Sequence, residues 1–178
     1  MCGIVGYIGE KQAEDILLGG LKKLEYRGYD SAGVAIIDDG HLDIAKKSGK
    51  LDILVDDLAS SPLKGVIGIG HTRWATHGRP TDNNAHPHKS PNGKIAIVHN
   101  GIIENFQELK NTYLANHTFV SETDTEVVAH LLEKFYAGNL EETVDKVLSL
   151  IKGSYALVII SQDEPDKIIV SRMDSPLV

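Results

Sequence analysis

The start of the chain constrains the fold more than any other stretch. Cys2, the single cysteine among 178 residues, is followed by Gly3-Ile4-Val5-Gly6-Tyr7-Ile8. A short apolar run interrupted by glycines is typical of a buried strand that another backbone approaches closely. Chain ends fray unless something ties them down, so a buried first strand would hold residue 2 inside the domain.

Cys2 also carries chemistry if Met1 is removed. Its thiol and its free α-amino group then lie on one residue, and groups of both kinds titrate close enough to neutrality to exchange protons. An N-terminal amine is a known general base for such a nucleophile. The alternative is a small buried cysteine that only packs, because most lone cysteines are structural. Position alone leaves both interpretations open.

Composition limits the class of protein and its partners. A length of 178 residues, with 42% hydrophobic and 24% charged residues, predicts one soluble domain over 1–178. The net charge of −7 argues against nucleic acid or an anionic membrane surface as a partner. No apolar run approaches the ~20 residues that span a bilayer. A single cysteine forms no internal disulfide, so we expect a cytoplasmic protein.

Hydrophobic periodicity predicts strands near both ends of the chain and helices between them. The turn of a β-hairpin is expected at Asp39-Gly40, and Thr123 and Glu126 have the spacing of a helix capping box. Such an arrangement predicts packed sheets covered by helices, in the α+β class. The expected strands cover 3–8, 33–37, 42–47, 66–69, 95–98, 155–160 and 167–170, and the expected helices cover 11–25, 51–58, 102–114, 124–136 and 140–151.

The longest expected loop, 73–93, begins with two residues suited to a binding site. The planar guanidinium of Arg73 can bind a carboxylate through two parallel hydrogen bonds, and Trp74, the single tryptophan, can form the wall of a small pocket. Loops beyond ~12–15 residues in compact domains are usually functional or disordered. The alternative is a surface arginine lying over a packed tryptophan.

Five histidines crowd the middle of the chain. The pair His86 and His88 suggests a metal site, but neighbouring carboxylates are scarce and the His-x-x-x-His and Cys-x-x-Cys spacings are absent. We therefore favour histidines that stabilise turns over metal ligands. The five are His71, His77, His86, His88 and His99.

Asn100, Gly101 and Asp124 complete a candidate site. A side-chain amide and a neighbouring main-chain N–H between strand 95–98 and helix 102–114 can form an oxyanion hole, although Asn-Gly at a strand end is also a common turn. Asp124 can pair with a ligand ammonium group, or be an acid at a helix N-terminus. Combined, the residues describe a site for an α-amino acid: Arg73 binds its carboxylate, Asp124 its ammonium group, and Cys2 attacks.

The motifs CGIVG, YRGYDSAG, HTRWATHG, NAHPH, HNGIIEN and SETDTE follow one another in this order. Together they closely resemble the N-terminal glutaminase domain of the glucosamine-6-phosphate synthase family (glutamine–fructose-6-phosphate aminotransferases, isomerising), whose members are class II glutamine amidotransferases. The similarity covers essentially the whole chain. It implies an N-terminal-nucleophile hydrolase fold, a four-layer αββα sandwich of two mainly antiparallel sheets.

The resemblance also implies roles for individual residues. Cys2 matches the nucleophile with its α-amine as base, and Asn100 and Gly101 match the oxyanion hole. Arg27 matches an arginine near the nucleophile in a supporting role. The residues that match the glutamine site are Arg73, Trp74, Thr76, His77, Gly101 and Asp124.

The resemblance further implies that L-glutamine is the substrate and that no cofactor or metal is needed. The closing segment 172–178 resembles the point where the glutaminase domain joins sugar-phosphate isomerase domains, so we expect those domains as partners in a longer, homo-oligomeric enzyme. Two alternatives stay open. One is a phosphoribosyl-pyrophosphate-type amidotransferase, whose RGQ-type and HTRY-type segments differ from those here, and the other is a non-catalytic glutamine-sensing domain.

Overall fold

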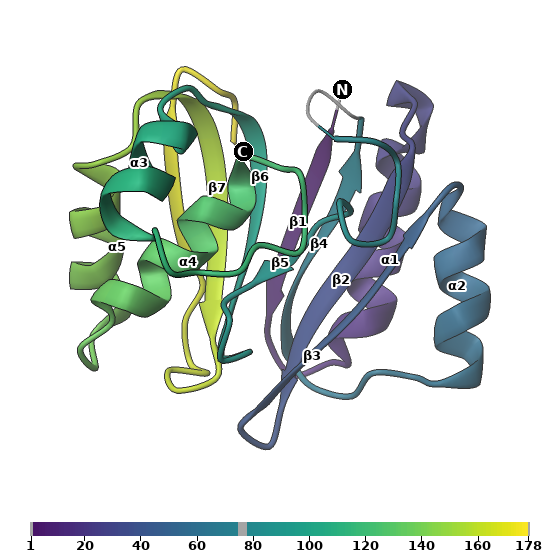
Figure 1. Cartoon of the computed structure of the whole chain (residues 1–178). Coiled ribbons are helices and arrows are strands. Elements are labelled where there is room, and N and C mark those ends of the chain that lie inside the picture. The colour runs from purple at the N-terminus through teal and green to yellow at the C-terminus, as the bar shows by residue number, and fades with distance from the viewer. Residues whose placement is uncertain (1, 75–77, 178) are drawn as a thin grey trace.

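Two four-stranded sheets stack face to face, and helices cover their outer faces (Figure 1). The computed structural model describes residues 2–74 and 78–177 and, of Arg27, the backbone alone. Sheet A has the order β1-β4-β2-β3 and sheet B the order β5-β6-β7-β8, and every pairing between these strands is antiparallel. The result is the αββα sandwich of the α+β class that the sequence predicts.

The strands and helices fall into two consecutive blocks of the chain, one for each sheet. The first block consists of β1 (Gly3–Ile8), α1 (Ala13–Leu24), the 3-10 turn η1 (Glu25–Arg27), β2 (Ser31–Asp38), β3 (His41–Ser48), α2 (Leu51–Ser60) and β4 (Ile67–Arg73). The second consists of β5 (His88–Lys89), β6 (Ile95–Ile103), α3 (Phe106–Tyr113), α4 (Thr125–Phe135), α5 (Leu140–Leu148), β7 (Gly153–Ser161) and β8 (Ile169–Met173).

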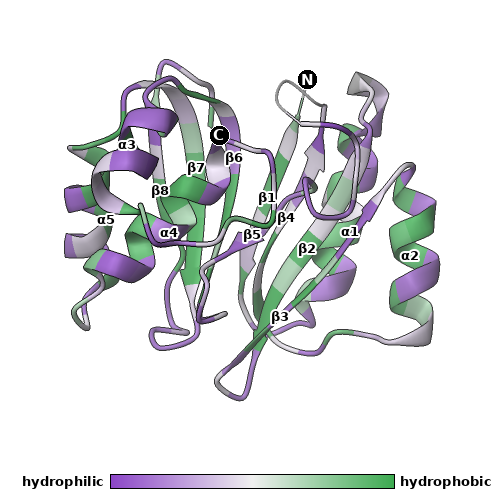
Figure 2. Ribbon diagram, viewed as in Figure 1, coloured by the Kyte–Doolittle hydropathy of each residue, from purple (hydrophilic) through white to green (hydrophobic). Residues whose placement is uncertain are grey.

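Three apolar layers hold the sandwich together. Along β2, Val34 and Ile36 face α1 and α2, whereas Ala35 and Ile37 pack between the two sheets. Successive side chains of a strand point to opposite faces, so a strand covered on both faces is apolar throughout. In Figure 2, β2 and β7 are accordingly drawn mostly in the hydrophobic colour.

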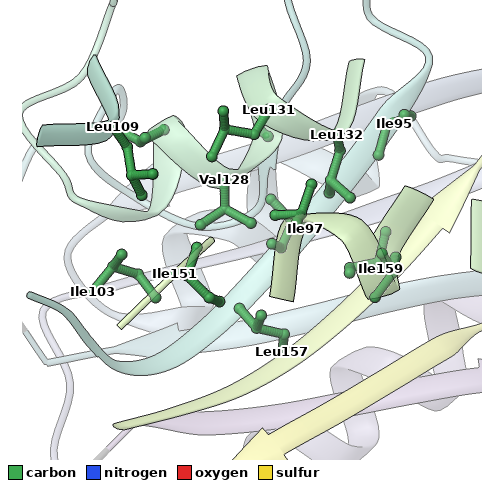
Figure 3. Packing of buried hydrophobic residues seen from close by; sticks show 14 of the residues in the cluster. Ile95, Ile97, Ile103, Leu109, Val128, Leu131, Leu132, Ile151, Leu157 and Ile159 are labelled. Carbon is green, nitrogen blue, oxygen red and sulfur yellow. The ribbon is translucent and has the colours of Figure 1, made fainter. Parts of the chain in front are cut away.

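The third layer lies between sheet B and helices α3, α4 and α5 (Figure 3). Ile97 and Ile159 from the sheet meet Val128 and Leu132 of α4, and all four side chains are at most 1% exposed. Burial of each such side chain contributes roughly 1.5–3 kcal/mol, which fixes α4 on the sheet. The N-terminus of α4 is thereby held beside β6.

The hairpin turn is confirmed, and two local expectations were wrong. Asp39 and Gly40 both have positive φ, 46° and 77°, as a two-residue hairpin requires. Strand β6 runs to Ile103 and α3 begins at Phe106, so Asn100-Gly101 lies inside a strand and not in a turn before a helix. Pairing with β7 along the full length of β6 outweighs the local preference of Asn-Gly for a turn.

The predicted capping box is also absent from the N-terminus of α4. The Glu126 carboxylate accepts hydrogen bonds from the main-chain N–H groups of Val120 and Ser121, at 2.8 and 2.7 Å, and not from that of Thr123. The carboxylate therefore fixes the loop before α4. In the described part of the chain, none of the helices combines the length and the apolar character needed to cross a membrane.

Candidate active site

The pairing of β1 with β4 fixes the position of Cys2, the residue before β1. Gly3 of β1 lies opposite Thr72 of β4, and the Gly3 N–H donates to the Thr72 hydroxyl at 3.1 Å. A Cβ on Gly3 would lie 2.7 Å from Leu24 of α1, so the glycine permits this close approach. The expected first strand is therefore present, but it lies at the edge of sheet A and only its Gly3 is buried. It begins at the upper end of the sandwich, next to the N-terminus (Figure 1).

The Cys2 sulfur contacts the main chain of Trp74. The Trp74 N–H donates to Sγ at 3.1 Å, and Sγ lies 3.6 Å from the Trp74 carbonyl oxygen, which accepts from the thiol. The main chain of Trp74 thus contacts the sulfur through both its N–H and its carbonyl group. Only a side-chain role was predicted for Trp74, because a pattern of residue types does not indicate which main-chain groups donate hydrogen bonds.

A cavity of about 240 Å³ opens beside the sulfur. Its lining comes from β4, β6 and the first residue of α4, and from residues outside the strands and helices, so neither sheet forms it alone. Larger cavities of about 400 and 410 Å³ lie elsewhere, but their linings lack Cys2, so the chemistry points to the smaller one. The residues that line it are Cys2, His71, Arg73, Trp74, His86, His99, Gly101, Ile102, Thr123, Asp124 and Thr125.

Asn100 and Gly101 reach this site from β6, on the opposite sheet. The Asn100 side-chain Nδ2 donates to the Cys2 carbonyl oxygen at 3.3 Å, so the carboxamide lies directly beside the candidate nucleophile. Gly101 has φ of 128°, and a Cβ there would lie 2.0 Å from the Ser154 carbonyl oxygen. This position therefore excludes any side chain, and the backbone of residue 101 is exposed to the cavity.

Arg73 is a buried arginine, so the alternative of a surface residue was wrong. The residue is 4% exposed, and Nη2 donates to the Gly78 carbonyl at 3.2 Å while Nη1 lies 3.8 Å from Asp30 Oδ1. These contacts fix the plane of the guanidinium at the wall of the cavity. A buried cation there favours an anionic ligand group.

Asp124 provides the opposite charge in the same cavity. It is 4% exposed and precedes α4, and its Oδ2 accepts from the Ile103 N–H at 2.6 Å. It is the N-cap residue of α4, as the alternative of an acid at a helix N-terminus predicted, but its side chain makes no capping hydrogen bond to that helix. One cavity thus holds a fixed cation and a fixed anion, the pair that an amino acid zwitterion complements.

Four buried histidines form a layer behind the cavity. His71 stacks on His86 with ring centroids 4.4 Å apart, and His86 meets His88 edge-on at 4.7 Å. Burial lowers the pKa of His71 to about 4 and the pKa of His86, His88 and His99 below the usual value. These imidazoles are therefore neutral near pH 7.

The histidine layer makes its hydrogen bonds within the chain. His88 Nε2 pairs with the Thr123 hydroxyl at 3.0 Å, and His99 Nδ1 pairs with the Thr125 hydroxyl at 2.8 Å. Over residues 2–74 and 78–177, no three His, Cys, Asp or Glu side chains are grouped so that they could hold a metal ion. The layer connects the two sheets with the loop before α4.

Several expected site residues lie outside the described residues. Thr76 and His77 fall in the gap between 74 and 78, and Met1 precedes the first described residue. Arg27 closes η1, and the adjacent Gly28 packs against Trp74, since a Cβ on it would lie 2.7 Å from the indole ring. The segment that contains Arg27 is thus next to the site.

Two further residues contribute to the site without having been predicted for it. Thr72 holds β1 in place through its hydroxyl, and His71 contacts the carboxamide of Asn100 at 2.8 Å. Both belong to the HTRW segment beside Arg73, and the alternation of side chains along a strand would have placed residues 71 and 73 on one face.

Comparison with known proteins identifies the class. Residues 71–174 match the model of the glutamine amidotransferase domain family. B. subtilis glutamine phosphoribosylpyrophosphate amidotransferase, solved with ADP and GMP, superimposes with a TM-score of 0.78 at 31% identity over 91% of this chain and 35% of that one. The structure of the allosteric regulatory enzyme of purine biosynthesis gives 0.81 at 29% identity, over 97% of this chain and 37% of that one. The chain belongs to the glutamine amidotransferase domain family, and its fold is that of the N-terminal-nucleophile amidotransferases.

The sequence comparisons narrow this class to one kind of enzyme. The chain is 56% identical over its whole length to glutamine–fructose-6-phosphate aminotransferase [isomerizing] from Caldanaerobacter subterraneus, and 54% identical to the enzyme of that name from Thermus thermophilus. It covers 29% and 30% of those proteins, so it spans about three tenths of their length. It corresponds to their N-terminal part, as the resemblance implied.

Proposed function

We propose that the chain hydrolyses the side-chain amide of L-glutamine to glutamate and ammonia through a thioester on Cys2. The observation that carries the proposal is the contact between the Asn100 carboxamide and the Cys2 carbonyl, at 3.3 Å, together with a cavity lined by Cys2, Arg73 and Asp124. The fold thereby brings together a nucleophile, an oxyanion donor and both charges for an α-amino acid. The first two, Cys2 and Asn100, lie 98 positions apart in the chain.

The first half of the proposed cycle forms the thioester. With Met1 removed, the α-amine of Cys2 takes the thiol proton and Sγ attacks the amide carbon of glutamine. The negative charge that develops on the amide oxygen is stabilised by Asn100 Nδ2 and the Gly101 N–H. The protonated amine then gives its proton to the leaving nitrogen, and ammonia departs.

The second half returns the enzyme to its starting state. Water loses a proton to the α-amine as it attacks the thioester, the same donors stabilise the second oxyanion, and the departing thiolate takes the proton back from the amine as glutamate is released. The proton of the new carboxyl group passes to ammonia, so the balance is glutamine plus water to glutamate plus ammonium. The main-chain N–H of Trp74, 3.1 Å from Sγ, supports the sulfur as a leaving thiolate.

Recognition of glutamine is proposed to precede this chemistry. Arg73 pairs with the α-carboxylate, assisted by Thr76 and His77, and Asp124 pairs with the α-ammonium group. Trp74 walls the pocket, and Arg27 has a supporting role beside it. The proposed residues are thus the nucleophile Cys2, the oxyanion donors Asn100 and Gly101, and the substrate set Arg73, Trp74, Thr76, His77, Gly101 and Asp124.

The wider reaction is proposed from the relatives. Because the matched aminotransferases are over three times as long as the chain, we propose that residues 1–178 act as the glutaminase domain of a longer cytoplasmic homo-oligomer. Its isomerase domains would use the ammonia to make glucosamine-6-phosphate from fructose-6-phosphate. A phosphoribosyl-pyrophosphate-type enzyme is less well supported, since the identity to that solved structure is 31% against 56%.

Covalent labelling tests the proposal. A glutamine analogue with an electrophile in place of the amide should add once to the wild-type chain, at Cys2, with loss of glutaminase activity in proportion. Intact mass should show that Met1 is absent, and an uncleaved N-terminal tag should abolish turnover because it blocks the amine. Cys2→Ala should fold and be inactive. Hydrolysis by the tagged protein would refute the amine as the base, and a folded wild-type chain that neither reacts nor hydrolyses would favour a glutamine-sensing domain.

A further inference from the structure

The Asn100 carboxamide is held from behind by His71. The His71 side chain is 1% exposed and lies on β4, facing β6. Its Nε2 is 2.8 Å from Asn100 Oδ1 and 3.1 Å from the main-chain carbonyl oxygen of His99. A single ring nitrogen therefore meets two oxygen atoms.

The His99 carbonyl decides where the imidazole carries its proton. A carbonyl oxygen only accepts hydrogen bonds, so Nε2 must carry the hydrogen, and a neutral imidazole has one N–H. Burial lowers the pKa of His71 to about 4, against the opposing effect of its hydrogen bond with Asn100. His71 is therefore the neutral Nε2–H tautomer near pH 7.

This tautomer fixes the direction of the carboxamide. The N–H of His71 requires the oxygen of Asn100 to face it, and the Cys2 carbonyl, 3.3 Å from Nδ2 at the other end, requires the amino group. Rotation of the carboxamide by 180° would set an amino group against an N–H and an oxygen against a carbonyl. Both contacts would then be repulsive.

The ring of His71 is itself held in place. It stacks on His86 at 4.4 Å with an interplanar angle of 21°, and His86 Nδ1 accepts the His99 N–H at 3.2 Å. The main chain of His99 in β6 thus fixes two imidazole rings: its carbonyl contacts His71, and its N–H donates to His86. The arrangement is built into the strand that carries Asn100.

Oxyanion stabilisation needs the amino group of Asn100 and is lost if the oxygen takes its place. We propose that His71 is a positioning residue for glutamine hydrolysis, whose Nε2–H holds the Asn100 carboxamide with its amino group on the side of Cys2, where it can donate to the oxyanion. This inference rests on the proposed function. It assigns no contact between His71 and substrate.

Paired substitutions test the coupling. Asn100→Ala should lower kcat by about 10²–10³-fold. His71→Phe keeps an aromatic ring against His86 but removes the donor, and we expect kcat to fall about tenfold or more while KM for glutamine is unchanged. In the Asn100→Ala background, His71→Phe should have no further effect on kcat. Equal losses in both backgrounds, or a rise in KM alone, would overturn the proposal.

Two further variants separate positioning from folding. His71→Gln can place an amide N–H near the position of Nε2 and should restore most of kcat. His117→Phe is the control, since His117 is half-buried and pairs with His130 instead of Asn100, and its kcat should equal that of the wild type. If the folded His71→Gln variant does not recover activity, the proposal is contradicted.

The tautomer can be measured in the unmodified chain, so the inference does not depend on variants that fold. Long-range ¹H–¹⁵N correlation spectra should show His71 with a protonated Nε2 and an unprotonated Nδ1 near pH 7. A protonated Nδ1 would refute the proposal. A wild-type chain with the expected tautomer but no glutaminase activity would instead refute the proposed function.

Discussion

At the scale of single residues, the site combines groups whose strength depends on burial. Arg73 and Asp124 are each 4% exposed, and charges in such surroundings interact more strongly than charges in water. Both are also fixed by main-chain groups, Arg73 by the Gly78 carbonyl and Asp124 by the Ile103 N–H. Because both side chains are already fixed, they need to move little when a ligand binds. We therefore expect substitutions of Arg73 and Asp124 to act on binding.

Arg73→Lys tests the carboxylate contact. Lysine keeps the charge but loses the planar fork, so KM for glutamine should rise at least about tenfold while kcat changes little, because the contact exists before and during reaction. Steady-state kinetics with glutamine and with an amide that lacks the α-carboxylate measure the effect. The variant should discriminate less between these two substrates, and an unchanged KM would remove Arg73 from the site.

Asn100→Ala tests the oxyanion contact by the opposite pattern. The charge grows only in the transition state, so kcat should fall by about 10²–10³-fold with KM nearly constant. Glutamate release from a single turnover distinguishes chemistry from product release. A variant that loses glutamine binding instead would make residue 100 a ground-state contact.

At the scale of elements, strand β6 and the loop before α4 shape the cavity. Gly101 occurs in β6 at φ of 128°, opposite Tyr155 of β7. The loop is held by Glu126, whose carboxylate also accepts from the Ser121 hydroxyl at 2.5 Å. The conformation of β6 at the cavity therefore depends on Gly101, and the conformation of the loop before α4 depends on Glu126.

Gly101→Ala should separate β6 from β7. The added Cβ would lie 2.0 Å from the Ser154 carbonyl oxygen, and overpacking of this kind costs about 1–3 kcal/mol or more. We expect a lower free energy of unfolding in urea together with loss of glutaminase activity. Gly19→Ala in α1 is the control: nothing lies within 4 Å of its Cβ, so it should be neutral or stabilising by up to ~1 kcal/mol.

Glu126→Gln should loosen the loop before α4 in a pH-dependent way. Burial alone would raise the pKa of Glu126, but hydrogen bonds from His130, Ser121 and the Val120 N–H outweigh it and lower the pKa to about 2. A lowered pKa stabilises the folded state above the ordinary pKa of a glutamate, ~4.3, and the stabilisation is lost as the pH falls toward 2.

The amide of the Gln variant sets an N–H against one of the main-chain donors, so we expect a loss of about 1.5–3 kcal/mol at pH 7. Urea unfolding of both proteins from pH 7 to pH 3 measures it. The difference between them should shrink over the acid part of this range. A constant difference would mean that the carboxylate charge does not carry the stabilisation.

At the scale of the whole molecule, the site exists only because the sheets stack. Cys2 and Arg73 come from sheet A, Asn100 and Gly101 from sheet B, and Asp124 from the helical layer outside sheet B. Figure 1 shows these elements converging at one end of the sandwich. All groups proposed for hydrolysis therefore lie within residues 2–124.

The isolated chain is accordingly expected to be a complete glutaminase. It should form glutamate and ammonia in equal amounts, and a chelator should leave the rate unchanged, since the proposed cycle uses thiol, amine and water. Added fructose-6-phosphate should neither accelerate hydrolysis nor give amino sugar. Coupled ammonia detection and mass analysis of sugars measure these outcomes. Glucosamine-6-phosphate formed by the chain alone would place the acceptor site within 1–178, and activity lost to chelation and restored by zinc would revive a histidine metal site.

The sequence alone determined the candidate nucleophile, the layer architecture and the class of enzyme. An apolar strand behind Cys2, strands apolar on both faces and the ordered motifs are local patterns, and the periodicity of side chains along a strand or helix encodes which faces are buried. Arg73, Asn100, Gly101 and Asp124 were all predicted for one site. The structure places Arg73, Gly101 and Asp124 around one cavity with Cys2, and Asn100 against the Cys2 carbonyl.

The tertiary structure decided what spacing along the chain does not encode. Asn100-Gly101 favours a turn locally, yet pairing with β7 makes it a strand, and Glu126 serves a loop instead of a helix cap. The role of His71 depends on a carbonyl of β6 that faces it across the interface between the sheets. Contacts between stacked sheets join residues far apart in sequence, and the proton on Nε2 is set by those neighbours because an imidazole has two tautomers that its own sequence leaves open.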